Sequence, residues 1–181
     1  MTTRYASVAE FRNETNIQSG EYSDAQLEQL LDTATEQIDF RTGRTWQGVQ
    51  TVTDEYYDGN GETFLYLNHP DVTSIDALAI NENLDGTYTS VTLDYVRLYG
   101  DIGRIELDVE NSDSSNIEVD SFVKGPKTVK VSYKWGNSAP TEEVKQLCIL
   151  MVEERISSTP EKIEEIKRRI NSLRFFDIED V

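Results

Sequence analysis

The chain contains 181 residues, and its 17 Lys and Arg residues against 34 Asp and Glu residues give a formal net charge of -17. So negative a chain is poorly suited to bind nucleic acids or anionic membranes through electrostatic attraction, and we exclude both classes. Its single cysteine excludes an intramolecular disulfide framework. The sequence contains no run of eighteen apolar residues, the length that would predict a membrane span. The first residues lack the apolar core of a signal peptide, so we expect no secretion by that route.

The negative charge is spread over the whole chain, because acidic residues exceed basic ones over 1–49, over 50–136 and over 137–181 alike. A surface of this kind repels itself at low ionic strength, whereas in molar salt the Debye length falls to about 3 Å and the repulsion is screened. We therefore expect a protein adapted to high salt, from a halophilic cell or a virus that infects one. The alternative is an acidic protein of ordinary habitat.

Two helices are predicted at the start of the chain. Ser7 and Glu10 have the spacing of a capping box, which predicts a short helix that ends between residues 13 and 16. Ser23 and Gln26 repeat this spacing, and apolar residues then recur every three or four positions until Gly43. The apolar residues of this second stripe are Leu27, Leu30, Leu31, Ala34 and Ile38. We expect the acids on the opposite side, namely Asp24, Glu28, Asp32, Glu36 and Asp39, to form a solvated face.

From about Thr51 the apolar period changes to two and turn residues multiply, which predicts short antiparallel strands. The predicted strands are 51–57, 63–67, 74–80, 88–93, 104–109, 117–123 and 128–135. Strands at such spacing favour a β-sandwich or small barrel. We therefore predict an α+β fold, in which helices of 1–49 and 137–173 form a bundle and 50–136 form an inserted antiparallel β domain.

Two further helices are predicted after Gly136. Pro140 suits the first turn of a helix, and six apolar residues follow it in a stripe that must be buried: Val144, Leu147, Cys148, Met151, Val152 and Ile156. Thr159 and Pro160 then start a last helix. Its stripe of Ile163, Ile166, Ile170 and Leu173 is narrow, which suits contact with one partner helix, from the same chain or from a neighbour. We read residues 174–181, with Phe175 and Phe176, as a tail that orders on docking.

Few residues suggest chemistry. The single histidine, His69, lies at a strand-to-turn position without nearby cysteines, so we interpret it as a surface turn residue and not as a zinc ligand. Cys148 lies in an apolar stripe, where a free cysteine is typically a small buried hydrophobe. The segment 58–62 lacks the ligand spacing of a calcium loop, and phosphate-binding, dinucleotide and nucleophile-elbow motifs are missing from the sequence. We predict no catalytic, cofactor-binding or metal-binding residues, and no enzyme.

The order of the segments carries a resemblance. Five stretches and one helix match in sequence order. They are 34–46, 65–75 with its Pro-x-Val-x-Ser-Ile run, 94–95 followed by 103–107, 129–136 with its Tyr-x-x-Gly run before Pro140, and the helix 144–156. Together they cover most of residues 5–157. In this order the chain resembles the head-tail connector, or adaptor, proteins of tailed viruses with long tails.

This resemblance implies a structural virion protein without catalysis. Its expected state is a closed ring of identical copies, twelvefold, which lies under the portal protein and presents its other face to the stopper or tail proteins. The genome DNA is expected to pass through the acidic lumen without specific binding. The expected location is the neck of the virion, with assembly in the host cytoplasm, and the acidic surface favours a virus of a halophilic archaeon.

We expect the contacts with other subunits or with the portal to come from the last helix and its tail. The candidate residues are Ile163, Ile166, Arg168, Arg169, Ile170, Leu173, Arg174, Phe175 and Phe176. The three arginines could equally be ordinary cations near a helix C-terminus, favoured by the helix dipole.

Two alternative functions stay open. One is a stopper or tail-completion protein of the same neck. The other is an acidic ion- or carbohydrate-binding β module with a face of six tyrosines, namely Tyr56, Tyr57, Tyr66, Tyr88, Tyr95 and Tyr99, although tyrosines on alternating strands more commonly lie in a core or at its rim.

Overall fold

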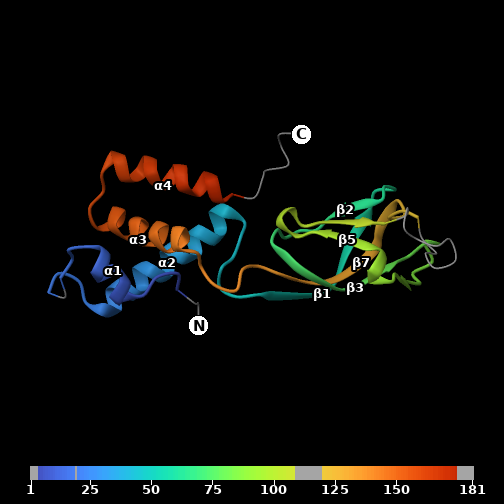
Figure 1. Ribbon diagram of the computed structural model, residues 1–181, viewed down its shortest axis with the longest axis horizontal. Helices are drawn as coiled ribbons and strands as arrows, with labels where there is room; N and C mark the ends of the chain where they lie inside the picture. The colour runs from blue at the N-terminus through green and yellow to red at the C-terminus, as the bar shows by residue number, and fades with distance from the viewer. Residues whose placement is uncertain (1–3, 19, 109–119, 175–181) are drawn as a thin grey trace. The chain divides into compact units, whose positions relative to one another are not determined.

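The computed structural model describes residues 4–18, 20–108 and 120–174, and their contacts divide the chain into two compact units. Residues 1–48 and 137–181 belong to a helical unit, and residues 49–136 belong to a β unit. Each unit has a hydrophobic core of its own. The fold is therefore of the α+β class, with helices and antiparallel sheets in separate parts of the chain (Figure 1).

Four helices make up the described part of the helical unit: α1 (Val8–Glu14), α2 (Asp24–Thr42), α3 (Glu142–Ile156) and α4 (Pro160–Leu173). The two predicted capping boxes are confirmed, because Ser7 with Glu10 and Ser23 with Gln26 satisfy the first free amides of α1 and α2. Gly43 ends α2 with φ of 67°, a left-handed conformation that glycine adopts without steric cost. The local sequence thus fixes where these helices begin and end.

The core of the helical unit lies between α2, α3 and α4. The predicted stripes of α2 and α3 meet there, and α4 covers them with Ile166 and Ile170, which are 6% and 5% exposed. In Figure 1 α4 runs back along α3, from which it is separated by a turn of three residues. Most apolar residues of α2, α3 and α4 are therefore buried within the same chain.

Asp39 ties the segment before α1 to the end of α2. Its carboxylate accepts hydrogen bonds from the Tyr5 hydroxyl and from Nε2 of Gln47, the latter over 2.6 Å. The Tyr5 hydroxyl oxygen in turn accepts a hydrogen bond from the Trp46 backbone amide over 2.9 Å, and the rings of Tyr5 and Trp46 pack edge to face. Burial raises the pKa of Asp39 above its usual value, against the effect of these hydrogen bonds. The prediction of a solvated face is wrong for this residue.

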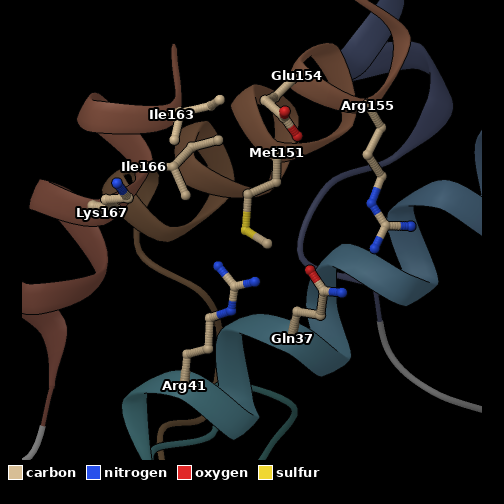
Figure 2. A pocket seen from close by; sticks show the side chains of 8 residues that line it. All are labelled: Gln37, Arg41, Met151, Glu154, Arg155, Ile163, Ile166 and Lys167. Carbon is tan, nitrogen blue, oxygen red and sulfur yellow. The ribbon is translucent and has the colours of Figure 1, made fainter. Parts of the chain in front are cut away.

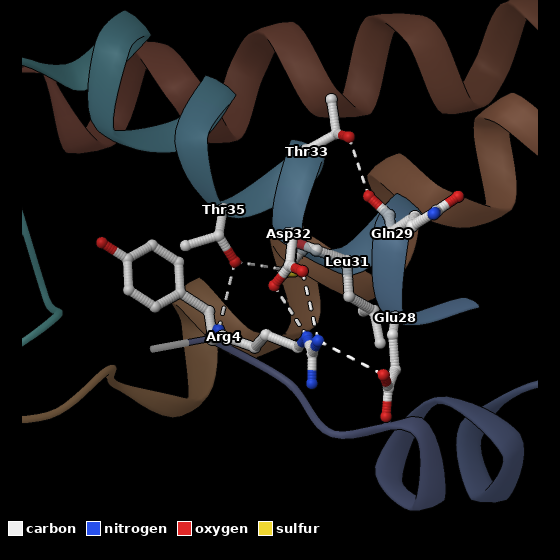
Figure 3. Close-up of polar contacts among 9 residues, drawn as sticks. Arg4, Glu28, Gln29, Leu31, Asp32, Thr33 and Thr35 are labelled. Atoms are coloured by element: carbon white, nitrogen blue, oxygen red, sulfur yellow. Dashed lines mark hydrogen bonds and ion pairs between the residues drawn. The ribbon is translucent and has the colours of Figure 1, made fainter. Parts of the chain in front are cut away.

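Arg4 covers the middle of the same helix (Figure 3). Its Nε donates to Oδ1 of Asp32 over 2.7 Å, and its second nitrogen lies 3.4 Å from Glu28. The next backbone amide, of Tyr5, donates to Oγ1 of the buried Thr35 over 3.2 Å. Asp32 and Glu28 are therefore ion-pair partners that hold the N-terminal segment, although their side chains keep 34% and 46% of their surface exposed on the predicted solvated face.

The start of α3 differs from the prediction by two residues. Thr141 is the N-cap, and its hydroxyl accepts a hydrogen bond from the Val144 backbone amide. Pro140 therefore lies just before the cap and not in the first turn. Thr159 caps α4 and Pro160 is its first residue, as predicted. A capping hydroxyl that accepts a hydrogen bond from a backbone amide fixes the helix start more closely than a proline, because proline is tolerated at several nearby positions.

The β unit contains two antiparallel sheets. The first has the order β1 (Gln50–Gly59), β7 (Gly125–Trp135), β3 (Val72–Ile80) and β4 (Thr89–Ser90), and the second has the order β2 (Phe64–Tyr66), β6 (Arg104–Leu107) and β5 (Val96–Tyr99). One apolar cluster draws on both sheets, including Tyr57 and Val131 of the first and Leu65 and Ile105 of the second.

Two predicted strands differ from the structure, and one strand of the structure was not predicted. The strand predicted over 88–93 is only β4, since Leu93–Tyr95 form a short 3-10 helix. The strand predicted over 117–123 lies partly outside the described residues, and its described part, 120–123, is irregular, with Phe122 buried. β5 was not predicted, because its four residues lie between two 3-10 turns and are too short for a clear period.

The chain leaves the helical unit and returns to it at neighbouring positions. The Gly48 amide donates to the Asn137 carbonyl over 3.1 Å, and the Asn137 amide donates to the Thr45 carbonyl over 3.0 Å. In the β unit, Gln50 at the start of β1 pairs with Trp135 at the end of β7. The β unit is thus an insertion whose two ends lie together.

Candidate assembly surfaces

The predicted apolar stripe of α4 divides into a buried and an exposed part. Ile166 and Ile170 pack into the core of the same chain, Leu173 is half-buried against it, and Ile163 is 37% exposed. Ile166 and Ile170 thus already have a partner, in α2 and α3 of their own chain. A neighbouring molecule could reach Ile163 without any rearrangement.

Both predicted arginines of α4 bind one carboxylate of the same helix. Arg168 contacts both oxygens of Glu165, over 2.9 and 2.7 Å, and Nε of Arg169 donates to the same carboxylate over 2.6 Å. These hydrogen bonds lower the pKa of Glu165 to about 2. Arg168 is exposed and Arg169 half-buried, so the cluster keeps one net positive charge and one accessible guanidinium.

Arg174 is the last described residue, and its Nε donates to the backbone carbonyl of Arg41 over 3.1 Å. It therefore lies beside the C-terminal end of α2. Phe175 and Phe176, the other two predicted interface residues of this tail, lie outside the described residues.

A groove opens between α2, α3 and α4 (Figure 2). Its volume is about 300 Å³, and Met151 and Ile166, both nearly buried, lie at its bottom. Arg41 extends from α2 toward Met151 in Figure 2, while Arg155 of α3 and Lys167 of α4 lie at its sides. The groove thus combines an apolar floor with cations, which is unusual in so acidic a chain.

Phe40 is the most exposed large apolar side chain among the described residues, with 90% of its surface accessible. It lies on α2 two positions after the buried Ile38, which places it about 200° around the helix, on the polar side. A phenyl group in this position does nothing for the core of its own chain. Sequence reasoning missed it as a candidate, although an aromatic residue on an otherwise polar helix face was the available signal.

A second exposed aromatic group lies on the three-stranded sheet. The Arg104 guanidinium lies 4.8 Å from the ring centre of Phe64 and 5.0 Å from that of Tyr99, and it pairs with Glu106 over 2.8 Å. Tyr66, which is 46% exposed, packs edge to face on Phe64. These side chains form an ordered patch in which arginine is held between aromatic rings, a composition enriched at protein interfaces.

The six tyrosines proposed for a carbohydrate face do not gather as one group. Tyr57 is buried, Tyr56 packs edge to face on Tyr88, and Tyr99 belongs with Tyr66 to the other sheet. Among the described residues, no cluster of three or more His, Cys, Asp or Glu side chains could hold a metal ion. A sugar-binding or ion-binding role therefore gains no support from this part of the chain.

His69 lies in the turn between β2 and β3, but its ring is half-buried, so its interpretation as a surface residue is wrong. The ring stacks on Trp135 at 3.9 Å, and Nδ1 lies 2.7 Å from the Tyr133 hydroxyl. Tyr133 and Tyr57 both donate their hydroxyl protons to Glu55, so the Tyr133 oxygen is left to accept a proton from Nδ1. Burial lowers the pKa of His69, and the nearby Glu55 opposes this shift. The cluster joins β1, β7 and the turn.

Cys148 is fully buried in the helical core, as predicted. Burial raises the pKa of its thiol to about 11, so the reactive thiolate is scarce at neutral pH. No helix of the described ranges is long and apolar enough to span a membrane.

The comparisons with known proteins bear on the fold. No family model and no curated protein sequence matches the chain. Solved structures do match. The chain is similar to one in the "Neck of empty GTA particle computed with C6 symmetry", with a TM-score of 0.59 and 18% identity over 98% of this chain and 93% of that one.

Two further structures give the same result. One is the "Neck of native GTA particle computed with C12 symmetry", with a TM-score of 0.57 and 17% identity over 96% of this chain and 91% of that chain. The other is the "Virion of native gene transfer agent (GTA) particle", with a TM-score of 0.55 and 17% identity over 98% and 93%. The chain therefore shares the fold of proteins found in the neck of a gene transfer agent particle.

Proposed function

We propose that this chain is a structural component of the neck of a tailed virus or virus-like particle. The observation that carries the proposal is the match over nearly the whole length of both chains, helices and β insertion together, with neck proteins. Local motifs alone could arise by chance, whereas this order of four helices with an inserted β unit is a specific arrangement. Fold alone does not fix function, so the surfaces of the chain provide the second argument.

Within the neck we propose the adaptor position, in which identical copies form a closed ring below the portal and contact stopper or tail proteins. The necks to which the chain is similar were computed with sixfold or twelvefold symmetry, and the twelvefold one supports a twelvefold ring. In a ring every copy offers one surface to each neighbour, so exposed apolar side chains on two different sides can both be covered. Phe40 and Ile163 of the helical unit and the Arg104 patch of the β unit are the surfaces we assign to such contacts.

The same proposal accounts for the acidic surface. A ring with 17 excess negative charges per copy has no cations in sufficient number to release counterions from DNA, so the genome would move through its lumen without being held. Molar salt would screen the repulsion between copies, which supports assembly in a halophilic host.

Assembly is tested by mass photometry of the purified chain in molar KCl, alone and with a portal protein from the same source. The expected result is a twelvefold ring, formed alone or on the portal. Phe40→Asp should abolish it, and Asp76→Asn, an exposed change in the β unit, serves as the control. A ring of another order would refute the twelvefold assembly, and a monomer in the presence of the portal would refute the proposal.

The arginine cluster needs a gentler substitution than charge reversal. Replacing Arg168 and Arg169 by Glu would place three carboxylates at adjacent helix positions and weaken α4 itself. Arg168→Gln with Arg169→Gln removes the charges and keeps a hydrogen-bonding side chain. Loss of rings in this variant, with α4 still folded, would support an interface role, and unchanged rings would leave the arginines as partners of Glu165 only.

A further inference from the structure

We propose that Phe40 of one copy occupies the groove between α2, α3 and α4 of the next copy. The proposal rests on the ring assembly proposed above and names the two surfaces that meet in it. It gives Phe40 and Ile163 one shared contact, because the phenyl ring of one copy covers the exposed isoleucine at the groove of another.

The apolar part of the groove suits an aromatic side chain. Met151 and Ile166 form its bottom, and Ile163 stands at its edge with 37% of its surface exposed. The volume of about 300 Å³ lies at the lower end of the sizes of ligand pockets, so the groove suits a large side chain and not a whole helix. The thioether of Met151 and the guanidinium of Arg41, which extends toward it in Figure 2, both make favourable contacts with aromatic rings.

Phe40 does not fill the groove of its own chain. Gln37 and Arg41 line the groove from α2, whereas Phe40 lies about 60° around the helix from Gln37 and about 100° from Arg41. Its side chain accordingly keeps 90% of its surface exposed. Each copy therefore carries both halves of the contact and presents them in different directions. A contact between two different surfaces can repeat from copy to copy around a ring.

The groove carries an excess of positive charge. Its lining contains three cations, Arg41, Arg155 and Lys167, against the carboxylate of Glu154. Lys167 pairs with Glu164 over 2.8 Å. Neither arginine forms an ion pair within residues 4–18, 20–108 and 120–174. Two guanidinium groups beside an apolar floor suit an apolar side chain that has a carboxylate as its neighbour.

Glu36 supplies that carboxylate beside Phe40. It lies one helical turn before Phe40 on the same side of α2, about 6 Å away along the helix axis, and its side chain is exposed. Its carboxylate also has no ion-pair partner in the part of the chain that the structure describes. When Phe40 lies on Met151 of the next copy, Glu36 comes within reach of the free arginines there. Two acidic copies thus attract each other at this contact.

Disulfide trapping tests the contact directly. A tagged Phe40→Cys chain and an untagged Ile163→Cys chain are co-expressed, assembled with the same portal protein in molar KCl and oxidised, and free thiols are blocked before electrophoresis. We expect a disulfide between tagged and untagged chains. Cys148 is fully buried and does not compete. In the control, Glu161→Cys replaces Ile163→Cys; this exposed position lies on the opposite side of α4 and should give no such disulfide.

Charge exchange tests the same contact with Phe40 in place. Arg155→Glu should abolish the rings, because it sets two carboxylates against each other in a groove where salt screens charges less than at an open surface. Adding Glu36→Arg should restore the rings, which a misfolded helical unit could not do. Lys124→Glu makes the same change of charge at an exposed site of the β unit and should leave the rings intact.

The outcomes separate this inference from the proposed function. Wild-type rings without the mixed disulfide, or rings that Arg155→Glu leaves unchanged, overturn the inference while the ring itself stands. The inference is also overturned if two Phe40→Cys chains join to each other in preference to the mixed pair, since Phe40 would then meet itself across a symmetry axis. A wild-type chain that stays monomeric with the portal overturns both.

Discussion

Nδ1 of His69 lies 2.7 Å from the hydroxyl oxygen of Tyr133, and the same imidazole stacks on Trp135. Because Tyr133 gives its proton to Glu55, Nδ1 of His69 must be the nitrogen that carries a proton in this contact. A turn is thereby fastened to the central strand β7.

This contact predicts a pH dependence of stability. The folded pKa of His69 is lowered by burial, so as pH falls through about 6.5 the unfolded chain binds a proton that the folded chain does not. The free energy of unfolding should therefore decrease from pH 7.5 to pH 5.5. The contribution of Glu55, whose pKa its hydrogen bonds hold low despite burial, is lost only at lower pH.

Denaturant unfolding in molar KCl, followed by tryptophan fluorescence, measures this slope. His69→Gln should reduce the slope of the unfolding free energy against pH. The raised pKa of Asp39 changes stability with pH in the opposite sense, but Asp39 is present in both proteins, so it does not contribute to the difference. Equal slopes for the two proteins would show that His69 is not the titrating group.

Salt should stabilise the fold. With a net charge of -17, self-repulsion is strongest at low ionic strength and is screened as the Debye length falls to about 3 Å at 1 M. The melting temperature should therefore rise between 0.05 and about 2 M KCl. Sorbitol at matched osmolality provides the uncharged control, and a melting temperature that ignores KCl would refute adaptation to high salt.

Phe40 and Leu31 lie on the same helix, but replacement by alanine should affect stability at Leu31 and assembly at Phe40. Leu31 is fully buried, so Leu31→Ala should cost about 2–5 kcal/mol of unfolding free energy. Phe40→Ala should change it by less than about 0.5 kcal/mol but should weaken assembly. Denaturant melts and mass photometry distinguish the two effects; a large loss of stability in Phe40→Ala would mean that Phe40 packs within its own chain.

Gly103 should tolerate no side chain. It has φ of 60°, and a Cβ there would lie 2.3 Å from the His69 carbonyl oxygen. Gly86 has φ of 88° with open space around it, so Gly86→Ala measures the backbone strain alone. Gly103→Ala should lower the melting temperature of the β unit more than Gly86→Ala does, and an equal effect would mean that the His69 backbone moves aside easily.

The sequence was most informative where a helix end depends on one residue. Ser23, Gln26 and Gly43 predicted the bounds of α2, because capping and left-handed backbone are local requirements. β5 was missed because four residues contain too little periodicity, although its neighbours β2 and β6 hold it in a sheet. Long-range pairing decides such short strands.

The candidate surfaces were harder to predict than the helices. The narrow stripe of α4 was assigned to a neighbour or to the same chain, and only the packing of Ile166 on α2 and α3 distinguishes these. Asp39 and His69 looked like surface residues because their partners, Tyr5 and Tyr133, are 34 and 64 positions away. Polar networks of this kind leave no local pattern.

The adjacency of Gly48 and Asn137 has an evolutionary consequence. Seen from the helices, the β unit of residues 49–136 occupies the place of one connection, since the chain departs and comes back at hydrogen-bonded neighbours. The β unit can therefore be lengthened, shortened or replaced without disturbing the helical unit. Chains of this fold can thus change the surface that the β unit presents while keeping the helical unit.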